Sequence, residues 1–215
     1  PHMLPKQEVW GKIMSSLGIN NNDDILIYDN SDLKSSCRLW FSLLYFGHDE
    51  KKIHILNGGL KKWIFENKPI TKDTTEIIES NYVANEKENL VVSFDQIKKN
   101  ILSKSFNVID ARSLERFEGK VSEPRKGLRS GHIQNSFCLP FNQCINQKTG
   151  EFKNLEELRE LFNQNENIEK RLDQVFTCGS GVTAAVLAYA YKMVNNDYIP
   201  KIYDGSWSEY GKYPA

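Results

Sequence analysis

The sequence has few of the features that mark membrane proteins, nucleic-acid-binding proteins or metalloproteins. None of its apolar runs approaches the roughly 20 residues that a membrane-spanning helix needs. Lys and Arg together number 28, as do Asp and Glu, so the formal net charge is zero and no broad basic surface is expected. The four cysteines have no metal-ligand spacing. We therefore expect no metal, no cofactor, no nucleic acid and no membrane as a partner.

The most informative stretch surrounds Cys178. Residues 175–177 predict a short buried strand, and residues 184–194, apolar and free of Gly and Pro, predict a helix. Backbone N–H groups and the helix dipole favour an anion in a loop that joins a strand to a helix. A thiolate there is expected to have a lowered pKa and to act as a nucleophile. Gly179 and Gly181 allow the backbone angles that such a loop needs. The alternative is a buried structural cysteine.

The chain contains two copies of one unit. Asp29 in the first copy corresponds to Cys178 in the second, and a long helix, a strand and an Asn-Gly or Asp-Gly pair follow each. From Asp29 to Gly58 is 29 residues, and from Cys178 to Gly205 is 27. An aspartate cannot carry a transferable sulfur, so the first copy is expected to be a structural partner of the second.

Strands that alternate with helices predict parallel, helix-flanked sheets and an α/β fold. The expected strands are 25–28, 53–56, 90–92, 108–110, 136–139, 175–177 and 201–203. The expected helices are 5–17, 33–46, 60–65, 94–102, 113–117, 155–163, 184–194 and 207–210, with Ser93 as an N-cap.

These patterns closely resemble the tandem-domain rhodanese superfamily. The loop Cys178-Gly179-Ser180-Gly181-Val182-Thr183 is similar to that of its 3-mercaptopyruvate sulfurtransferase branch, and segments 46–49, 58–60, 110–113, 131–133 and 203–207 also match. The resemblance implies two rhodanese-like domains, each a mainly parallel sheet flanked by helices. Residues 1–72 would form an inactive N-terminal domain, 73–89 a linker and 90–215 the catalytic domain.

The family's first domain opens with its own strand and helix, equivalent to 107–117 in the second domain. Because no segment before Pro1 supplies them, the first domain is expected to lack its N-terminal part and the natural protein to be longer.

The resemblance implies a sulfurtransferase activity. Cys178 would take sulfur from 3-mercaptopyruvate as a persulfide, release pyruvate and pass the sulfur to a thiol or thioredoxin-like acceptor. Thiosulfate sulfurtransferases carry basic residues where this chain has Gly179 and Ser180, so the uncharged loop is expected to hold a dianion less well. Thiosulfate as donor remains the alternative, as does a non-enzymatic persulfide carrier. Phosphatases and arsenate reductases of this fold carry an arginine where Ala184 stands, so they are excluded.

Two further residues are expected to act with Cys178. In the family a Ser-His-Asp set handles the proton, and Ser180 and His2 match its serine and histidine, while the aspartate has no counterpart in this chain. Ser180 could instead be a small turn residue, and His2 could be an expression remnant. A working thiolate fits a reducing compartment, so a cytoplasmic location is expected, or a mitochondrial one in a eukaryote.

Substrate binding is assigned by the resemblance to Arg116 and Arg125, together with loop residues Gly179, Gly181, Val182 and Thr183. A planar guanidinium meets a carboxylate with two hydrogen bonds, which suits the carboxylate of the donor. The alternative for two arginines in a charged loop is a solvated surface.

The remaining candidates are expected to be structural. Arg112 is expected to pair with a carboxylate at the strand end, and Arg129 to lie on the surface. Core positions are expected for Cys37 and, in a strand, Cys138, and a structural turn for His132. His48 and His54 are expected to be structural or exposed, and Cys144 has no family counterpart.

Overall fold

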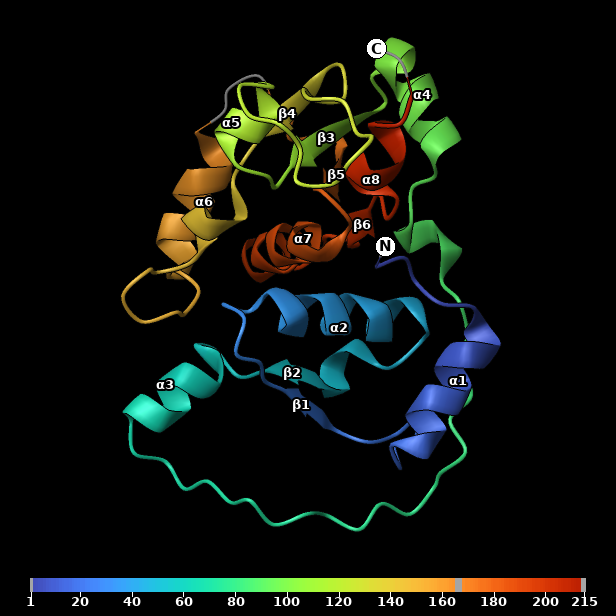
Figure 1. The fold of residues 1–215 in the computed structure, drawn as a ribbon, viewed down its shortest axis with the longest axis vertical. Coiled ribbons are helices and arrows are strands. Elements are labelled where there is room, and N and C mark those ends of the chain that lie inside the picture. Colours follow the sequence, from blue (N-terminus) through green and yellow to red (C-terminus); the bar gives the residue numbers. More distant parts are fainter. Residues whose placement is uncertain (1, 165–167, 214–215) are drawn as a thin grey trace.

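The computed structural model describes residues 2–164 and 168–213, which form two α/β units that meet along a pair of helices. Figure 1 shows α2 (Lys34–Tyr45) and α7 (Val182–Val194) side by side between the two sheets. The two copies seen in the sequence are therefore two spatial units, and the long helix of each copy forms the contact.

The first unit is built on a two-stranded parallel sheet. Strand β1 (Ile25–Ile27) pairs with β2 (Ile53–Ile55), with Ile25 opposite Ile53. The remaining elements are α1 (Gln7–Ser16), a 3-10 turn η1 (Glu50–Lys52) and α3 (Gly59–Phe65).

The second unit has a four-stranded parallel sheet in the order β4-β3-β5-β6. The strands are β3 (Phe106–Asp110), β4 (Ser136–Cys138), β5 (Asp173–Thr177) and β6 (Lys201–Ile202). The helices around it are α4 (Phe94–Ser103), α5 (Leu114–Phe117), α6 (Leu155–Asn163), α7 and α8 (Ser206–Tyr210), with 3-10 turns η2 (Glu88–Leu90) and η3 (Phe141–Cys144).

Side chains alternate across this sheet, because successive residues of a strand point to opposite faces. Ile109 and Phe176 pack in the large core that includes α6, α7 and the first unit. Their neighbours Val108 and Val175 pack in a smaller core with Ile97 of α4, Trp207 and Tyr203. Both faces of the interior strands are thus covered, as parallel sheets require.

Local signals explain where the helices begin. Ser93 and Gln96 form a capping box at the start of α4, and Asn154 and Glu157 form one at the start of α6. Each box satisfies backbone N–H groups that a helix end otherwise leaves unpaired. The expected N-cap at Ser93 is confirmed.

The contact between the units depends on small side chains. Ala184, Ala185 and Ala188 of α7 are fully buried, and so are Cys37 and Phe41 of α2. Alanines let two helix backbones approach closely and leave room for aromatic side chains from the partner. This packing brings the start of α2 near the loop that contains Cys178.

The prediction of a strand at residues 90–92 is wrong. Residues 88–90 form η2, and pairing is limited to a bridge between Val91 and Ile202 and one hydrogen bond from Val92 N to Ile202 O, 2.9 Å. Ser93 then caps α4, so the chain leaves the sheet edge before a strand can form.

Part of the proposed linker 73–89 packs on the first unit. Tyr82 and Ala84 are buried, and Asn85 N donates to Phe46 O at 2.9 Å. The division at residues 72 and 89 stays a proposal. In Figure 1 the preceding residues cross below β1 and return beside α1.

Candidate active site

Cys178 lies directly after β5, an interior strand of the sheet, and lines a cavity of about 380 Å³. Its Sγ accepts a hydrogen bond from the backbone N–H of Ser180 at 3.4 Å. Its own N–H donates to Ser206 Oγ at 3.2 Å, and its carbonyl accepts the N–H of Trp207 at 2.9 Å. The first residues of α8 therefore hold the main chain of Cys178 in place, and this fixes the direction of its thiol.

The two loop glycines are needed for different reasons. Gly181 has a φ of +78°, the left-handed region that favours glycine. Gly179 does not, but a Cβ there would lie 3.1 Å from Arg116 Nη2 and 3.4 Å from Arg125 Nη1. The expectation of unusual backbone angles holds for Gly181, whereas Gly179 leaves space for two guanidinium groups.

Ser180 connects the loop to both His2 and Arg125. Its Oγ lies 2.8 Å from His2 Nδ1 and accepts a hydrogen bond from Arg125 Nη2 at 3.2 Å. Since arginine only donates, the hydroxyl proton is free to point at Nδ1 when the ring carries its own proton on Nε2. His2 is exposed as a residue, yet local desolvation and the charge of Arg125 lower its pKa. The neutral ring can thus accept a proton from Ser180.

Arg116 and Arg125 reach the cavity from α5 and the following loop. Arg116 is held by a buried carboxylate, with Nε 3.1 Å from Glu123 Oε1 and Nη2 2.6 Å from Glu123 Oε2. Its remaining N–H groups are available to a ligand. Two positive charges therefore border a loop that the sequence describes as uncharged.

The residues that line the cavity differ from the predicted set at three positions: Pro124 was not predicted, and His2 and Gly181 do not line it. Gly181 lies behind the loop, where a Cβ would be 2.8 Å from Asp204 Oδ1. The lining residues are Arg116, Pro124, Arg125, Cys178, Gly179, Ser180, Val182 and Thr183.

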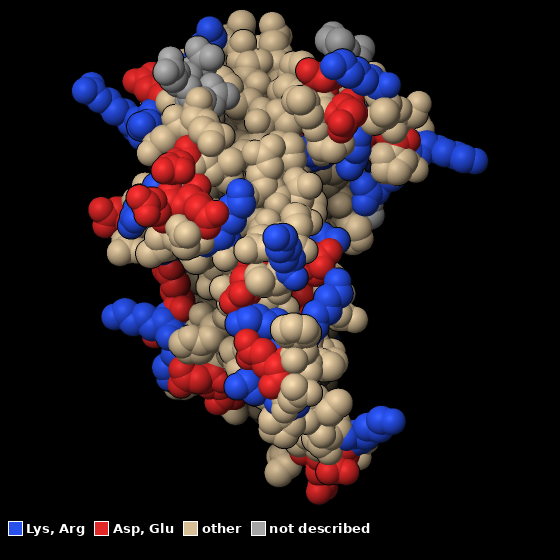
Figure 2. All heavy atoms as spheres, turned by 90° about the vertical axis from the view of Figure 1, so that its left-hand side faces the viewer, with Lys and Arg blue, Asp and Glu red and all other residues tan. Residues whose placement is uncertain are grey.

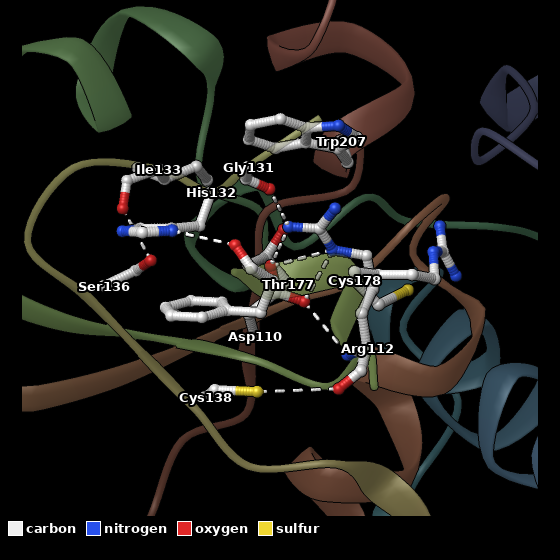
Figure 3. A network of polar contacts seen from close by, with 12 residues as sticks. Asp110, Arg112, Gly131, His132, Ile133, Ser136, Cys138, Thr177, Cys178 and Trp207 are labelled. Atoms are coloured by element: carbon white, nitrogen blue, oxygen red, sulfur yellow. Dashed lines mark hydrogen bonds and ion pairs between the residues drawn. The ribbon is translucent and has the colours of Figure 1, made fainter. Parts of the chain in front are cut away.

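A buried ion-pair network holds Arg116 in place, and Figure 3 shows the Asp110–Arg112 part of it next to Trp207. Arg112 donates to both oxygens of Asp110, the shortest contact being 2.7 Å, and its Nη1 donates to Glu123 Oε1 at 2.9 Å. All three side chains are at most 1% exposed. The expected pairing of Arg112 with a carboxylate is confirmed, and Glu123 links it to Arg116.

Trp207 extends the network to a second arginine. The guanidinium carbons of Arg112 and Arg129 lie 4.4 and 4.7 Å from the Trp207 ring. Trp207 Nε1 also donates to Arg129 O at 2.8 Å. Arg129, expected on the surface, is only partly exposed because it stacks on this ring.

The other cysteines are poor candidates for a nucleophile. Burial raises the pKa of Cys37, and it raises the pKa values of Cys138 and Cys144 to about 12. Cys37 lies in the core as expected, whereas Cys138 is only half-buried in β4. A thiol with a raised pKa stays protonated at neutral pH, and the protonated form is not the nucleophile.

The other histidines have structural partners. His48 is buried between Tyr82 Oη and Asp23 O, and His54 is exposed beside Asp24. His132 stacks on Phe117, with Nδ1 2.8 Å from the Phe117 carbonyl oxygen. These contacts agree with the expected structural role of His132, and the chain bends just before it, at residues 130–131.

The corresponding loop of the first unit is filled by its own carboxylate. Asp29 Oδ1 accepts the N–H groups of Ser31 and Leu33 at 3.3 and 3.2 Å. Oδ2 accepts the Ser31 hydroxyl at 2.9 Å and the Ser36 N–H at 2.8 Å. These hydrogen bonds outweigh partial burial, which alone would raise the pKa, and keep the pKa of Asp29 below its ordinary value.

Surface charge is mixed on the face that Figure 2 shows, where Lys and Arg alternate with Asp and Glu. Among residues 2–164 and 168–213, no three His, Cys, Asp or Glu side chains are grouped so that they could hold a metal ion. No helix in the same ranges has the length and apolar character to span a bilayer.

Comparison with known families gives matches over both units. The model of the rhodanese-like domain matches residues 1–66 and again residues 93–213. The chain belongs to the rhodanese family.

Rhodanese-family relatives with similar sequences carry names that refer to both donors. "Thiosulfate/3-mercaptopyruvate sulfurtransferase 1, mitochondrial" of Arabidopsis thaliana is 35% identical over all of this chain and 61% of its own length. The 3-mercaptopyruvate sulfurtransferase of Homo sapiens is 35% identical over 97% of this chain and 69% of its own. The chain thus spans about two thirds of the length of these relatives.

Solved rhodanese-family structures share the arrangement of both units. SseA of Escherichia coli, a 3-mercaptopyruvate sulfurtransferase by its description, superposes with a TM-score of 0.84 at 32% identity, over 97% of this chain and 76% of its own. Tum1 of Saccharomyces cerevisiae gives a TM-score of 0.86 at 26% identity, over 98% and 73%.

Sequence reasoning missed three residues of this rhodanese site. Arg38 and Asp204 form an ion pair of 2.7 Å behind the loop, and Glu123 joins Arg112 to Arg116. A glutamate two residues before Arg125, a predicted substrate-binding arginine, is the signal that could have identified Glu123. Arg38 lies in a helix of the other unit and gives no such signal.

Proposed function

We propose that this chain is a sulfurtransferase that accepts sulfur from 3-mercaptopyruvate on Cys178 and passes it to a thiol. The observation that carries the proposal is the placement of one thiol in a cavity beside two guanidinium groups and a Ser180–His2 pair. A small anion with a carboxylate can contact the arginines while its sulfur lies next to Cys178 Sγ. The hydroxyl of Ser180 would then be close to the carbon atom of the donor whose bond to sulfur breaks.

In the first half-reaction the Cys178 thiolate attacks the sulfur of the donor. An S–S bond forms, the C–S bond breaks, and its electron pair stays on carbon as the enolate of pyruvate. The proton that leaves the thiol of 3-mercaptopyruvate ends on that carbon. The Cys178 thiolate and 3-mercaptopyruvate thus give the Cys178 persulfide anion and pyruvate. Ser180 and neutral His2 would relay this proton.

In the second half-reaction an acceptor thiolate attacks the outer sulfur of the persulfide. The new S–S bond lies on the acceptor, and the electron pair of the broken bond returns to Cys178 as thiolate. Small thiols and a thioredoxin-like protein are the proposed acceptors. A reducing compartment, the cytoplasm or the mitochondrial matrix, would keep Cys178 reduced between cycles.

Thiosulfate is the second candidate donor. The two guanidinium groups that border the cavity favour a dianion as well as a carboxylate, which weakens the expectation based on an uncharged loop. The names of several relatives also include thiosulfate. A non-enzymatic carrier would form the persulfide without steady-state turnover.

Mass spectrometry tests the proposal directly. Incubation with 3-mercaptopyruvate should add one sulfur atom to the peptide that contains Cys178 and release pyruvate, and a later addition of thiol should remove the sulfur. Absence of the added sulfur with either donor would rule out sulfur transfer. A persulfide without repeated turnover would favour the carrier.

We expect Arg116→Lys and Arg125→Lys each to lower kcat/KM for 3-mercaptopyruvate about tenfold to hundredfold. The loss of one hydrogen bond to a charged group costs about 1.5–3 kcal/mol, and each 1.4 kcal/mol is about tenfold. At position 116 a lysine ammonium cannot keep both contacts with Glu123 and still reach the substrate, and at position 125 it replaces a planar fork by a point charge. Steady-state kinetics with pyruvate detection gives the measurement.

The matched control for these variants is Arg159→Lys on the exposed side of α6. It should keep wild-type kcat/KM. Alkylation of Cys178 by a neutral reagent should keep its rate in all three variants. Full efficiency in Arg116→Lys and Arg125→Lys would mean that the arginines do not bind the donor.

We also expect Gly179→Arg combined with Ser180→Lys to raise the ratio of thiosulfate to 3-mercaptopyruvate turnover by about tenfold or more, the value of one charge-assisted hydrogen bond. The new cations favour a dianion, the side chain at 179 crowds Arg116 and Arg125, and the proton relay of Ser180 is lost. Gly179→Ala, which adds only a Cβ, is the control. An unchanged ratio of the two kcat/KM values would contradict this.

A further inference from the structure

Arg38 reaches from the first unit to the backbone of the catalytic loop in the second. It lies on α2, and its side chain is 13% exposed. Nη1 donates to Gly181 O at 3.2 Å, and Nη2 donates to His2 O at 2.8 Å. One guanidinium therefore joins the carbonyl of the predicted catalytic histidine to the loop of Cys178.

Asp204 completes this contact from the other side. Its side chain is 3% exposed, and Oδ1 lies 2.7 Å from Arg38 Nη1. Oδ2 accepts the backbone N–H of Leu4 at 2.9 Å. The Arg38–Asp204 pair thus holds segment 2–4 at two points, the carbonyl of His2 and the amide of Leu4.

His2 needs such support for two reasons. It precedes α1 in a stretch without helix or strand, so no regular backbone pairing fixes its position. Its φ is +64°, a left-handed conformation that non-glycine residues adopt at a cost and that surrounding contacts must maintain. The hydrogen bond that the structure shows for its backbone carbonyl comes from Arg38.

The packing leaves little freedom around the pair. A Cβ on Gly181 would lie 2.8 Å from Asp204 Oδ1 and 2.9 Å from Arg38 Nη1. The pair is therefore fitted against the backbone of the catalytic loop as well as against segment 2–4. A shift of the guanidinium would move the loop and the histidine relative to each other.

We propose that Arg38 is a positioning residue that acts through His2: it holds the imidazole at Ser180 and thereby makes the first unit part of the catalytic site. This rests on the proposed function, in which Ser180 and His2 relay the proton. The chemistry of Cys178 itself does not pass through Arg38. The effect of Arg38 on turnover should consequently require His2.

Arg38→Lys is the main test variant. The ammonium keeps the charge next to buried Asp204, so the fold is retained, but it lacks the fork that spans the His2 and Gly181 carbonyls. We expect kcat with 3-mercaptopyruvate to fall about tenfold to hundredfold, as for the loss of a charge-assisted hydrogen bond. KM and the thermal midpoint should stay near wild type. The control Arg159→Lys should change neither.

A double-mutant cycle with His2→Ala separates positioning from general support. If Arg38 acts through His2, adding Arg38→Lys to His2→Ala costs nothing further, because the coupled effects of neighbouring residues do not add. Additive losses would overturn the proposal. Wild-type turnover in either single variant would overturn it as well.

A spectroscopic measurement decides the matter without turnover. The groups that face the His2 ring are Ser180 and Arg125 from the second unit and Arg38 from α2. NMR titration of the His2 ring should show a pKa below that of free histidine in the wild type, and a return toward it in Arg38→Lys. An unchanged titration in Arg38→Lys would overturn the proposal, even if neither sulfur donor supports turnover and the sulfurtransferase function itself fails.

Discussion

Cys178→Ser should lose sulfur transfer by at least about a thousandfold, because the serine hydroxyl is protonated at neutral pH and cannot carry a transferable sulfur. The loop should keep its shape, since the Cys178 main chain is held by Ser206 Oγ and by the Trp207 N–H. Pyruvate release from 3-mercaptopyruvate, with thiosulfate turnover measured beside it, gives the result.

The other three cysteines provide the internal control. Cys37→Ala, Cys138→Ala and Cys144→Ala should keep most of the activity, because burial raises their pKa values and none of them lines the cavity. Turnover near wild type in Cys178→Ser would disprove the assignment of the nucleophile. A comparable loss in Cys138→Ala alone would point to that thiol instead.

Arg112→Met should lower the free energy of unfolding by about 3–5 kcal/mol, the range found when one member of a buried ion pair is removed. The substitution leaves Asp110, whose side chain is 1% exposed, without its arginine, and leaves Glu123, whose side chain is 0% exposed, with Arg116 alone. It also removes the guanidinium that contacts the Trp207 ring. Urea unfolding followed by circular dichroism gives the measurement.

The pH dependence of that variant identifies the cause. A buried carboxylate that has lost its counterion, as Asp110 has in this variant, favours the protonated form. The folded state then binds more protons than the unfolded state, so the deficit relative to wild type should shrink as pH is lowered. Arg159→Met on the exposed face of α6 should change stability by less than about 0.5 kcal/mol. A deficit in Arg112→Met no larger than in this control would argue against the buried network.

The catalytic loop and its arginines could be predicted from the sequence because their signals are local. A strand, a Cys-Gly-Ser-Gly loop and an apolar helix follow each other within 21 residues, from 174 to 194. Arg116 and Arg125 lie in a segment with matching family motifs, and the structure brings both to the cavity. Their role toward the donor remains a prediction.

Long-range contacts could not be predicted in the same way. Arg38 and Asp204 are 166 positions apart in the sequence (204 − 38). Their ion pair forms only because α2 packs on α7. Nothing in the pattern around either residue indicates this contact. Likewise, the charge near the loop comes from α5 and the loop after it, so the motif alone indicates an uncharged site.

The failed prediction of a strand at residues 90–92 shows that a local apolar pattern alone does not decide where a strand forms. Leu90, Val91 and Val92 are apolar and flanked by polar residues, which is typical of a strand. The capping box at Ser93 competes for the same stretch, and the helix that it starts ends the pairing with β6 after a single bridge.

Asp29 in the first loop and a persulfide on Cys178 in the second would place a negative charge at the same distance from the backbone, but for different lengths of time. The oxygens of Asp29 lie two bonds from Cβ, the same separation that the outer sulfur of a persulfide on Cys178 would have. The N–H groups of Ser31 and Ser180 bond to the side chains of Asp29 and Cys178 at 3.3 and 3.4 Å. The first loop thus holds its negative charge two bonds from Cβ at all times, whereas the second would hold it on Sγ at rest and on the outer sulfur, two bonds from Cβ, only between half-reactions. The contacts around the Asp29 carboxylate therefore show which donors a persulfide on Cys178 would be expected to meet.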